Sequence, residues 1–131
     1  MKAEDLMVGD RVFLFGDESV KVDCIGNVEV YLSDENGIDW RVTYDHIKPI
    51  PLTSESLEKN GFGYIKEDES LKHFYPGEEC YCKNMDLHIG TNKKGAYWLN
   101  YLCNSIYGIR YVHELQHALK LCGIDLEIKL I

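Results

Sequence analysis

The chain has 131 residues, of which 45% are hydrophobic and 27% are charged, and its formal net charge is −8 at pH 7. A chain of this size and composition can bury a core, which excludes a disordered protein, and no apolar run approaches the roughly 20 residues that a helix needs to cross a bilayer. The acidic start of the chain lacks the basic and then apolar pattern of a secretion signal, so we expect a cytoplasmic protein without a membrane partner.

The negative charge is concentrated in the first part of the chain. Residues 1–52 hold 11 acidic and 5 basic residues, whereas residues 53–131 hold 11 and 9. Nucleic-acid binders normally carry clustered cations, because phosphate neutralisation supplies most of their non-specific affinity. The distribution therefore argues against a nucleic-acid partner.

Short alternating runs, separated by turn residues, fill the chain from Leu6 to Ile50. In the run at 19–25, Val20, Val22 and Cys24 fall on one face, which is the period of a half-buried strand. Successive runs of this kind predict a small antiparallel meander that closes on itself to avoid open edges.

The first 51 residues resemble an SH3-like small barrel. The matching residues are VGDRV at 8–12, which opens the first strand, and YDHIKPI at 44–50, which resembles the single helical turn before a short last strand. The resemblance implies a fold and no substrate, because small barrels host unrelated functions.

A second part is predicted from residue 52 to residue 131. Two prolines, Pro49 and Pro51, stiffen the connection, Thr53 can cap the start of a helix, and Gly61 is placed to end it. Strand-like runs follow, separated by turn residues.

A helix is predicted near the end of the chain, with Gly123 as its C-cap, and the alternating run after it predicts a final strand. The whole chain is therefore predicted to be mainly β, or α+β. Its domains would be an SH3-like barrel at 1–51 and, at 52–131, a small α+β domain with antiparallel strands and a C-terminal helix.

Two longer segments carry a likeness over most of the chain. The segments PIPLTSESLEKNGF at 49–62 and YVHELQHALKLCGIDLEI at 111–128 resemble a group of Bacteroidales prophage and mobile-element proteins to which no activity is assigned. The resemblance implies a cytosolic protein associated with a phage or mobile element, and it does not imply a peptidase.

The last predicted helix contains His-Glu-x-x-His at 113–117. Two imidazoles one helical turn apart can bind a metal ion, and the glutamate between them can act as general base for bound water. In a minimal zinc-dependent hydrolase, His113 and His117 would be the ligands and Glu114 the catalytic base.

A catalytic zinc site also needs a third protein ligand. Downstream, the only carboxylates are Asp125 and Glu127, and upstream Glu78, Glu79 or His88 stays open. Because the pattern places none of them beside the histidines, we interpret the helix as a scaffold and predict no metal, no cofactor and no catalytic residue.

The 5 cysteines are an odd number without a framework spacing, which is typical of free thiols in a reducing compartment. Cys80 and Cys82 would need Cys103 and His88 to complete a zinc site, so we interpret them as buried thiols.

One segment is a possible interaction surface, because two lysines lie beside three aromatic residues that could stack on bases: Lys93, Lys94, Tyr97, Trp98 and Tyr101. This keeps a nucleic-acid-associated factor as an alternative, although a lysine-tipped hairpin leading into an aromatic core strand is the favoured interpretation.

The lack of any other catalytic pattern favours a non-enzymatic accessory module that holds a protein partner through the barrel and exposed aromatic residues.

Overall fold

A computed structural model of the chain describes residues 1–65, 79–84, 86–91, 95–102 and 104–129. The backbone divides into two compact units. The first comprises Met1–Pro51 and Tyr111–His117, and the second comprises Leu52–Arg110 and Ala118–Ile131. The first unit therefore includes the start of the helix that the sequence analysis placed in the second part.

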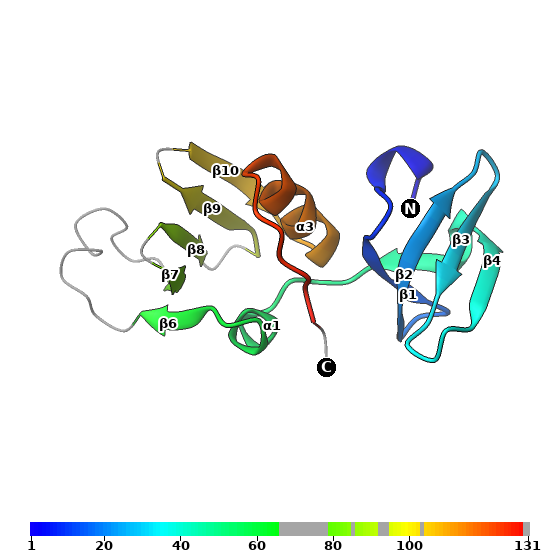
Figure 1. The fold of residues 1–131 in the computed structure, drawn as a ribbon, viewed down its shortest axis with the longest axis horizontal. Coiled ribbons are helices and arrows are strands. Elements are labelled where there is room, and N and C mark those ends of the chain that lie inside the picture. Colours follow the sequence, from blue (N-terminus) through cyan, green and yellow to red (C-terminus); the bar gives the residue numbers. More distant parts are fainter. Residues whose placement is uncertain (66–78, 85, 92–94, 103, 130–131) are drawn as a thin grey trace. The chain divides into compact units, whose positions relative to one another are not determined.

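The first unit is a five-stranded antiparallel sheet with two 3-10 turns (Figure 1). In chain order its elements are η1 (Ala3–Asp5), β1 (Arg11–Leu14), β2 (Glu18–Ile25), β3 (Glu29–Ser33), β4 (Asp39–Thr43), η2 (Tyr44–His46) and β5 (Ile47–Pro49). The strand order is β4-β3-β2-β1-β5, because the chain returns to the free side of β1 after η2. The meander, the helical turn and the short last strand occur in the order expected from the sequence, and the resemblance to an SH3-like barrel stays a prediction. Within residues 1–51, all of them described, β4 and β5 are the two ends of the ladder.

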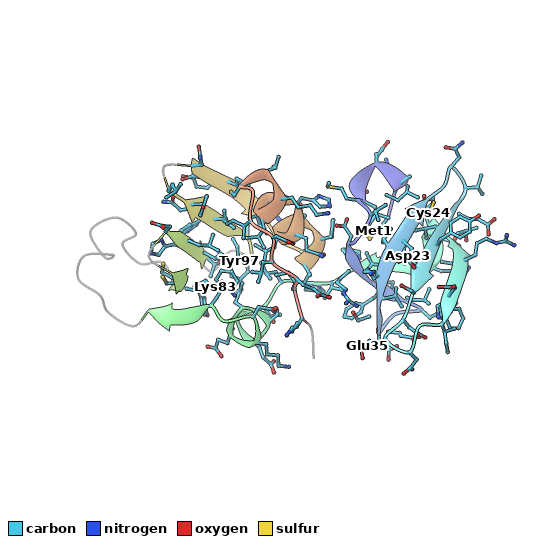
Figure 2. The ribbon with its side chains drawn as sticks, in the orientation of Figure 1. Met1, Asp23, Cys24, Glu35, Lys83 and Tyr97 are labelled. Atoms are coloured by element: carbon cyan, nitrogen blue, oxygen red, sulfur yellow. The ribbon has the colours of Figure 1, made fainter. Side chains whose placement is uncertain are left out.

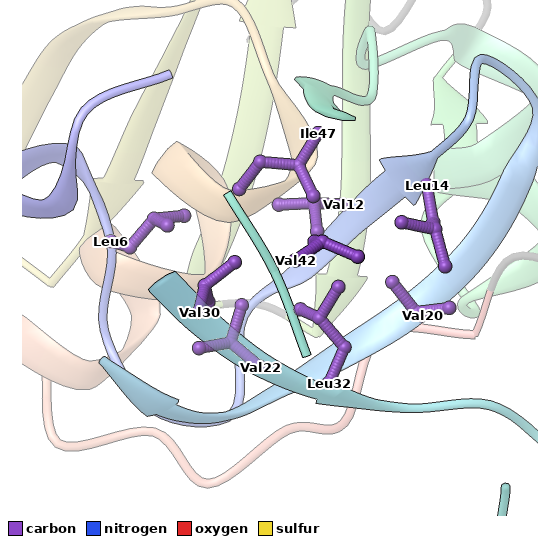
Figure 3. Packing of buried hydrophobic residues seen from close by; sticks show 9 residues of the cluster. All are labelled: Leu6, Val12, Leu14, Val20, Val22, Val30, Leu32, Val42 and Ile47. Atoms are coloured by element: carbon purple, nitrogen blue, oxygen red, sulfur yellow. The ribbon is translucent and has the colours of Figure 1, made fainter. Parts of the chain in front are cut away.

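The core of the first unit comes from the alternating runs. Nine branched side chains, none more than 9% exposed, form one cluster (Figure 3): Leu6, Val12, Leu14, Val20, Val22, Val30, Leu32, Val42 and Ile47. Burying each such side chain contributes about 1.5–3 kcal/mol, so this cluster is the main stabilising feature of the unit. Cys24, which the alternation places on the same face, is exposed instead, because the pairing of β2 with β3 shifts register between Val22 and Cys24.

The second unit contains a second antiparallel sheet, of order β10-β9-β8-β7-β6 (Figure 1). Its elements are α1 (Ser54–Lys59), β6 (Gly63–Ile65), β7 (Glu79–Asn84), β8 (Leu87–Thr91), β9 (Tyr97–Tyr101) and β10 (Asn104–Ile109). The last helix, α3 (Val112–Leu121), gives residues 112–117 to the first unit and residues 118–121 to the second. Two antiparallel sheets and a C-terminal helix confirm the predicted mainly β, or α+β, class.

The start and end of α1 are set by the residues that the sequence indicates. The Ser56 backbone N–H donates to Thr53 Oγ1 at 3.2 Å, and the Thr53 N–H donates to Ser56 Oγ at 3.0 Å. Gly61 has a φ of 86°, a conformation that glycine adopts without strain. The predicted helix cap at Thr53 is therefore confirmed.

The alternating segment after α3 is not a strand over its described residues 124–129, so that prediction is wrong. The side chain of Asn60 holds the segment: Asn60 Nδ2 donates to the Lys129 carbonyl at 2.7 Å, and the Lys129 N–H donates to Asn60 Oδ1 at 2.6 Å. The amide side chain of Asn60 thus makes hydrogen bonds of the kind that a neighbouring strand would make. Ile128, in the same segment, is only 1% exposed.

None of the helices in the described part of the chain is both long and apolar enough to span a membrane.

Candidate functional site

The His-Glu-x-x-His segment forms the first turns of α3, and the residues that follow β5 hold its start in place. Tyr111 makes an isolated antiparallel bridge with Pro51, and the Val112 N–H donates to the Ile50 carbonyl at 2.8 Å. Glu114 Oε1 accepts the Tyr111 N–H at 3.2 Å. Glu114, the candidate general base, is therefore the cap of its own helix.

His117 contacts a buried carboxylate that the sequence analysis did not single out. Its Nε2 lies 2.7 Å from Asp10 Oδ2, and Asp10 is 0% exposed. The same oxygen accepts the Met7 N–H at 2.8 Å, and the Asp10 carbonyl accepts the Val22 N–H at 2.8 Å. A buried carboxylate requires such partners, so His117 and Asp10 form a structural pair within the first unit.

Gln116 reinforces this pair from the neighbouring position of the helix. Its Oε1 accepts the Arg11 N–H at 2.9 Å, and its Nε2 donates to the Gly9 carbonyl at 3.0 Å. Both ends of the amide therefore bind the backbone of the turn that precedes β1. Gln116 and His117 together attach α3 to this turn.

His113 lies one helical turn before His117 and is only 6% exposed. Its ring stacks on Tyr111, with centroids 5.8 Å apart and planes 13° apart, and it meets the His117 ring edge to face at 5.6 Å. Burial lowers the pKa of His113, although the carboxylates of Asp10, Glu114 and Asp5 act in the opposite direction. Its Nδ1 and Asp10 Oδ1 are buried polar atoms without a hydrogen-bond partner in the structure.

The proposed third ligands of a zinc site are distributed as follows. Glu79, His88, Asp125 and Glu127 belong to the second unit, and Glu78 lies outside the described residues. Across the described part of the chain, no group of three or more His, Cys, Asp or Glu side chains is placed to hold a metal ion. The His117 ring is instead contacted by the carboxylate of Asp10, which lies directly against a ring nitrogen.

Asp10 could not be found from the sequence pattern. A Gly-Asp pair before a strand is ordinary turn chemistry, and nothing local to residue 10 indicates a partner 107 residues away.

The two cysteines considered for metal binding lie on β7. Cys80 is buried and pairs with Gly90 across the sheet, and Cys82 is partly buried opposite His88. Burial raises the pKa of the Cys82 thiol, which keeps it protonated. Cys103 lies outside the described residues.

The possible interaction surface at 93–101 is described only in part, because Lys93 and Lys94 lie outside the described residues. Trp98 is 8% exposed and packs over Gly90, where an added Cβ would lie 2.1 Å from the indole Cζ2. Tyr97, labelled in Figure 2, and Tyr101 are half-buried. Trp98 is thus a core residue of the second sheet, and a binding role for the two tyrosines stays a prediction.

A group of three rings on the first unit was not predicted. Phe15 and His46 are exposed, and Trp40 is half-buried against the hydrophobic core; the three are here called the aromatic cluster. Phe15 lies in the turn between β1 and β2 and is 57% exposed. Its ring meets Trp40 edge to face at 5.9 Å and His46 at 5.5 Å. The Phe15 N–H donates to the His46 carbonyl at 3.0 Å, which fixes the backbone that carries the ring.

Phe15 also has an unusual backbone conformation, with a φ of 52°. A bulky residue in this left-handed region is a genuine outlier and costs about 1–3 kcal/mol. Residues held at such a cost cluster at sites that contact ligands. Nothing in the sequence indicates this conformation, because Phe15 follows the apolar residues of β1 as if it continued the strand.

Comparisons of the chain with protein-family models, with curated proteins and with solved structures found no match.

Proposed function

We propose that the chain is a non-enzymatic accessory module that binds a protein partner, and that the aromatic cluster of the first unit contacts this partner. The observation that carries the proposal is Phe15, a ring that is 57% exposed and held at a φ of 52°. The resemblance of the sequence to Bacteroidales prophage and mobile-element proteins supports an accessory role in such an element.

The cluster has the chemistry of an interface anchor. Aromatic residues are enriched at protein interfaces, and a few buried aromatic anchors supply most of the binding energy there. Covering the exposed surface of a phenylalanine contributes up to about 1.5–3 kcal/mol. The hydrogen bond from the Phe15 N–H to the His46 carbonyl fixes the backbone that carries the ring, so little backbone entropy is lost on binding.

The charge around the cluster indicates a partner segment rich in lysine and arginine. Asp34 Oδ2 lies 3.5 Å from the indole nitrogen of Trp40, Asp45 directly precedes His46, and Asp17 closes the turn that holds Phe15. Arginine stacks on aromatic faces and pairs with carboxylates, so a basic segment satisfies both features of this surface.

Arg41, the basic residue that directly follows Trp40, pairs with a different carboxylate. Arg41 follows Trp40 on β4, where successive side chains point to opposite faces, and its Nε lies 3.5 Å from Glu29 Oε2. Arg41 is therefore paired with Glu29, away from the rings.

The contacts of α3 support a non-enzymatic role. Glu114 caps the helix, and Gln116 and His117 bind the turn before β1. Each of these polar side chains has a structural partner.

Peptide selection on the immobilised chain tests the proposal and does not require that the partner be identified first. Phe15→Gly removes the ring, and glycine accepts a φ of 52° without strain, so the variant should fold. The matched control is Leu102→Gly, because Leu102 has a φ of 56° and is 59% exposed but belongs to the second unit.

We expect the selected peptides to be rich in lysine and arginine. They should bind Phe15→Gly at least about tenfold more weakly, a loss of ~1.4 kcal/mol, and should bind Leu102→Gly normally. Equal binding to both variants, or selection of acidic peptides, would contradict the proposal.

A further inference from the structure

The two end strands of the first sheet differ in how they are protected against pairing with another chain. β5, at one end, has three residues and contains Pro49, which has no N–H to offer to a further strand. Two residues after Pro49, Pro51 forms an antiparallel bridge with Tyr111. This end of the sheet is therefore short, blunted by proline and followed by a segment that already has a partner.

β4, at the other end of the sheet, has none of these protections (Figure 1). Its five residues pair with β3 in one unbroken register. The strand contains no proline, no lysine and no bulge, which are common devices against edge-to-edge pairing. Its charged side chains, Asp39 and Arg41, share one face, so the face that carries Trp40 and Val42 is uncharged. β4 is therefore an edge to which a further strand can be added.

The hydrogen-bonding pattern shows which backbone groups of β4 lie on its open side. In the turn before the strand, the Asp34 N–H donates to the Ile38 carbonyl at 3.0 Å. Hydrogen-bonded and non-hydrogen-bonded pairs alternate along an antiparallel ladder, so Asp39, Arg41 and Thr43 occupy non-hydrogen-bonded positions. Their N–H groups therefore point away from β3, and so do the carbonyls of Asp39 and Arg41. These groups are the donors and acceptors that an added strand requires.

The charge along this edge determines the kind of segment that fits. Residues 34–45 contain four acidic residues and one basic residue, Arg41, which pairs with Glu29 on β3. A basic segment is attracted to this edge, whereas a second copy of the chain would bring the same excess of acidic residues to it. The Trp40 ring meets that of Phe15, so the side chain opposite Trp40 on an added strand would lie beside the aromatic cluster.

We propose that a basic, extended segment of the partner adds to β4 as a further strand of the sheet, with alternate side chains beside the aromatic cluster. This inference rests on the function proposed above and specifies how the partner is bound. Backbone hydrogen bonds to Asp39, Arg41 and Thr43 supply the affinity that any such segment shares. The side chains that face Trp40 supply the selection, because arginine stacks on aromatic rings and pairs with carboxylates.

N-methylation of a peptide backbone separates strand addition from binding through side chains alone. The probe is a blocked heptapeptide of alternating valine and arginine, compared with one form that is N-methylated at the arginines and another at the valines. Since N–H groups of alternate residues point to opposite edges of a strand, each form loses the donors of one edge. We expect one of the two forms to bind at least about tenfold more weakly than the unmodified peptide. Equal binding of all three peptides would overturn the inference.

Thr43→Pro blocks the edge of the chain itself without removing a hydrogen bond to β3. Thr43 has a φ of −75°, which proline adopts, and its N–H points away from β3. Thr43→Ala is the matched control, because it also removes the hydroxyl that donates to Asp45 but keeps the N–H. We expect Thr43→Pro to bind the unmodified peptide at least about fivefold more weakly than Thr43→Ala, while both keep the folded amide spectrum.

Hydrogen exchange of the labelled wild-type chain locates the added strand. On saturation with the unmodified peptide, the amides of Asp39, Arg41 and Thr43 should exchange at least about tenfold more slowly than in the free chain. Protection that instead rises with the concentration of the chain alone would overturn the inference, because a second copy would then occupy the edge.

The results distinguish this inference from the proposed function. If Phe15→Gly weakens peptide binding but the methylated forms bind as tightly as the unmodified peptide, the aromatic cluster binds a partner and strand addition is wrong. If one methylated form binds weakly and Phe15→Gly binds normally, the strand adds to β4 and the role of the aromatic cluster is wrong. A failure of the unmodified peptide to bind would contradict both.

Discussion

Asp10 and His117 lie 107 residues apart in the chain and meet at 2.7 Å, through Oδ2 of the carboxylate and Nε2 of the ring. The carboxylate side chain is 0% exposed and the imidazole is 26% exposed, so the contact joins a buried carboxylate to a partly exposed ring. Through this contact, the second histidine of the His-Glu-x-x-His segment attaches α3 to the turn before β1.

Removing this carboxylate should destabilise the first unit. We expect Asp10→Ala to lower the free energy of unfolding by about 1–3 kcal/mol, because the Met7 N–H and the His117 ring both lose their acceptor. Urea denaturation, followed by the fluorescence of Trp40 in a Trp98→Phe background, measures the change. The double variant with His117→Ala should show a coupling of at least ~0.5 kcal/mol, and strictly additive effects would argue against the pair.

Gln116 allows a sharper test of how α3 is attached. Gln116→Ala should cost about 1–2 kcal/mol, because the Arg11 N–H and the Gly9 carbonyl both lose a partner. Gln116→Glu keeps the acceptor for Arg11 but turns a carboxylate oxygen toward the Gly9 carbonyl. The glutamate variant should therefore be no more stable than the alanine variant in the same denaturation assay. Wild-type stability of Gln116→Glu would show that the bond to Gly9 contributes nothing.

His113 should make stability depend on pH. Burial lowers its pKa in the folded chain below the ordinary value of 6.5, so the unfolded chain binds more protons in this window. The contribution of His113 is complete above about pH 6.5 and is lost as the pH falls toward the lowered pKa.

A leucine at this position isolates the effect. His113→Leu removes the titrating group and the unpaired Nδ1, so at about pH 7.5 it should be as stable as the wild type or more stable. Between about pH 6.5 and about pH 5, its free energy of unfolding should fall less steeply than that of the wild type. Parallel pH profiles for the two proteins would contradict a lowered pKa at His113.

Gly90 should be intolerant of any side chain. A Cβ at this position would lie 2.1 Å from Trp98 Cζ2, so Gly90→Ala should displace the indole and cost about 1–3 kcal/mol or more. Gly63→Ala is the matched control on β6, because its nearest contact would be the Cys82 carbonyl oxygen at 3.8 Å. Thermal denaturation followed by Trp98 fluorescence, in a Trp40→Phe background, should separate the two variants, and equal melting temperatures would refute the close packing.

The features predicted correctly from the sequence are those with local causes. Alternation at Val20 and Val22 predicts a half-buried strand, and the side chain of Thr53 reaches an N–H only three residues away. Such patterns lie within one element, so they can be recognised before the fold is known.

The features that were missed depend on contacts between distant parts of the chain. Asn60 replaces a strand partner for Lys129, and the backbone of Phe15 is fixed by a carbonyl from η2. Neither residue differs, in its own sequence neighbourhood, from an ordinary helix end or strand end. The pairing of Asp10 with His117 is hidden for the same reason, although the His-Glu-x-x-His spacing itself is plain.

Binding through the aromatic cluster is tested most directly by mapping the amide and indole shifts of the labelled chain on addition of a selected basic peptide. The predicted result is a set of shifts at Phe15, His46 and the indole N–H of Trp40, which lies 3.5 Å from Asp34 Oδ2 in the free chain. Shifts confined to β9, at Tyr97 and Tyr101, would contradict this assignment and place the binding surface on the second sheet.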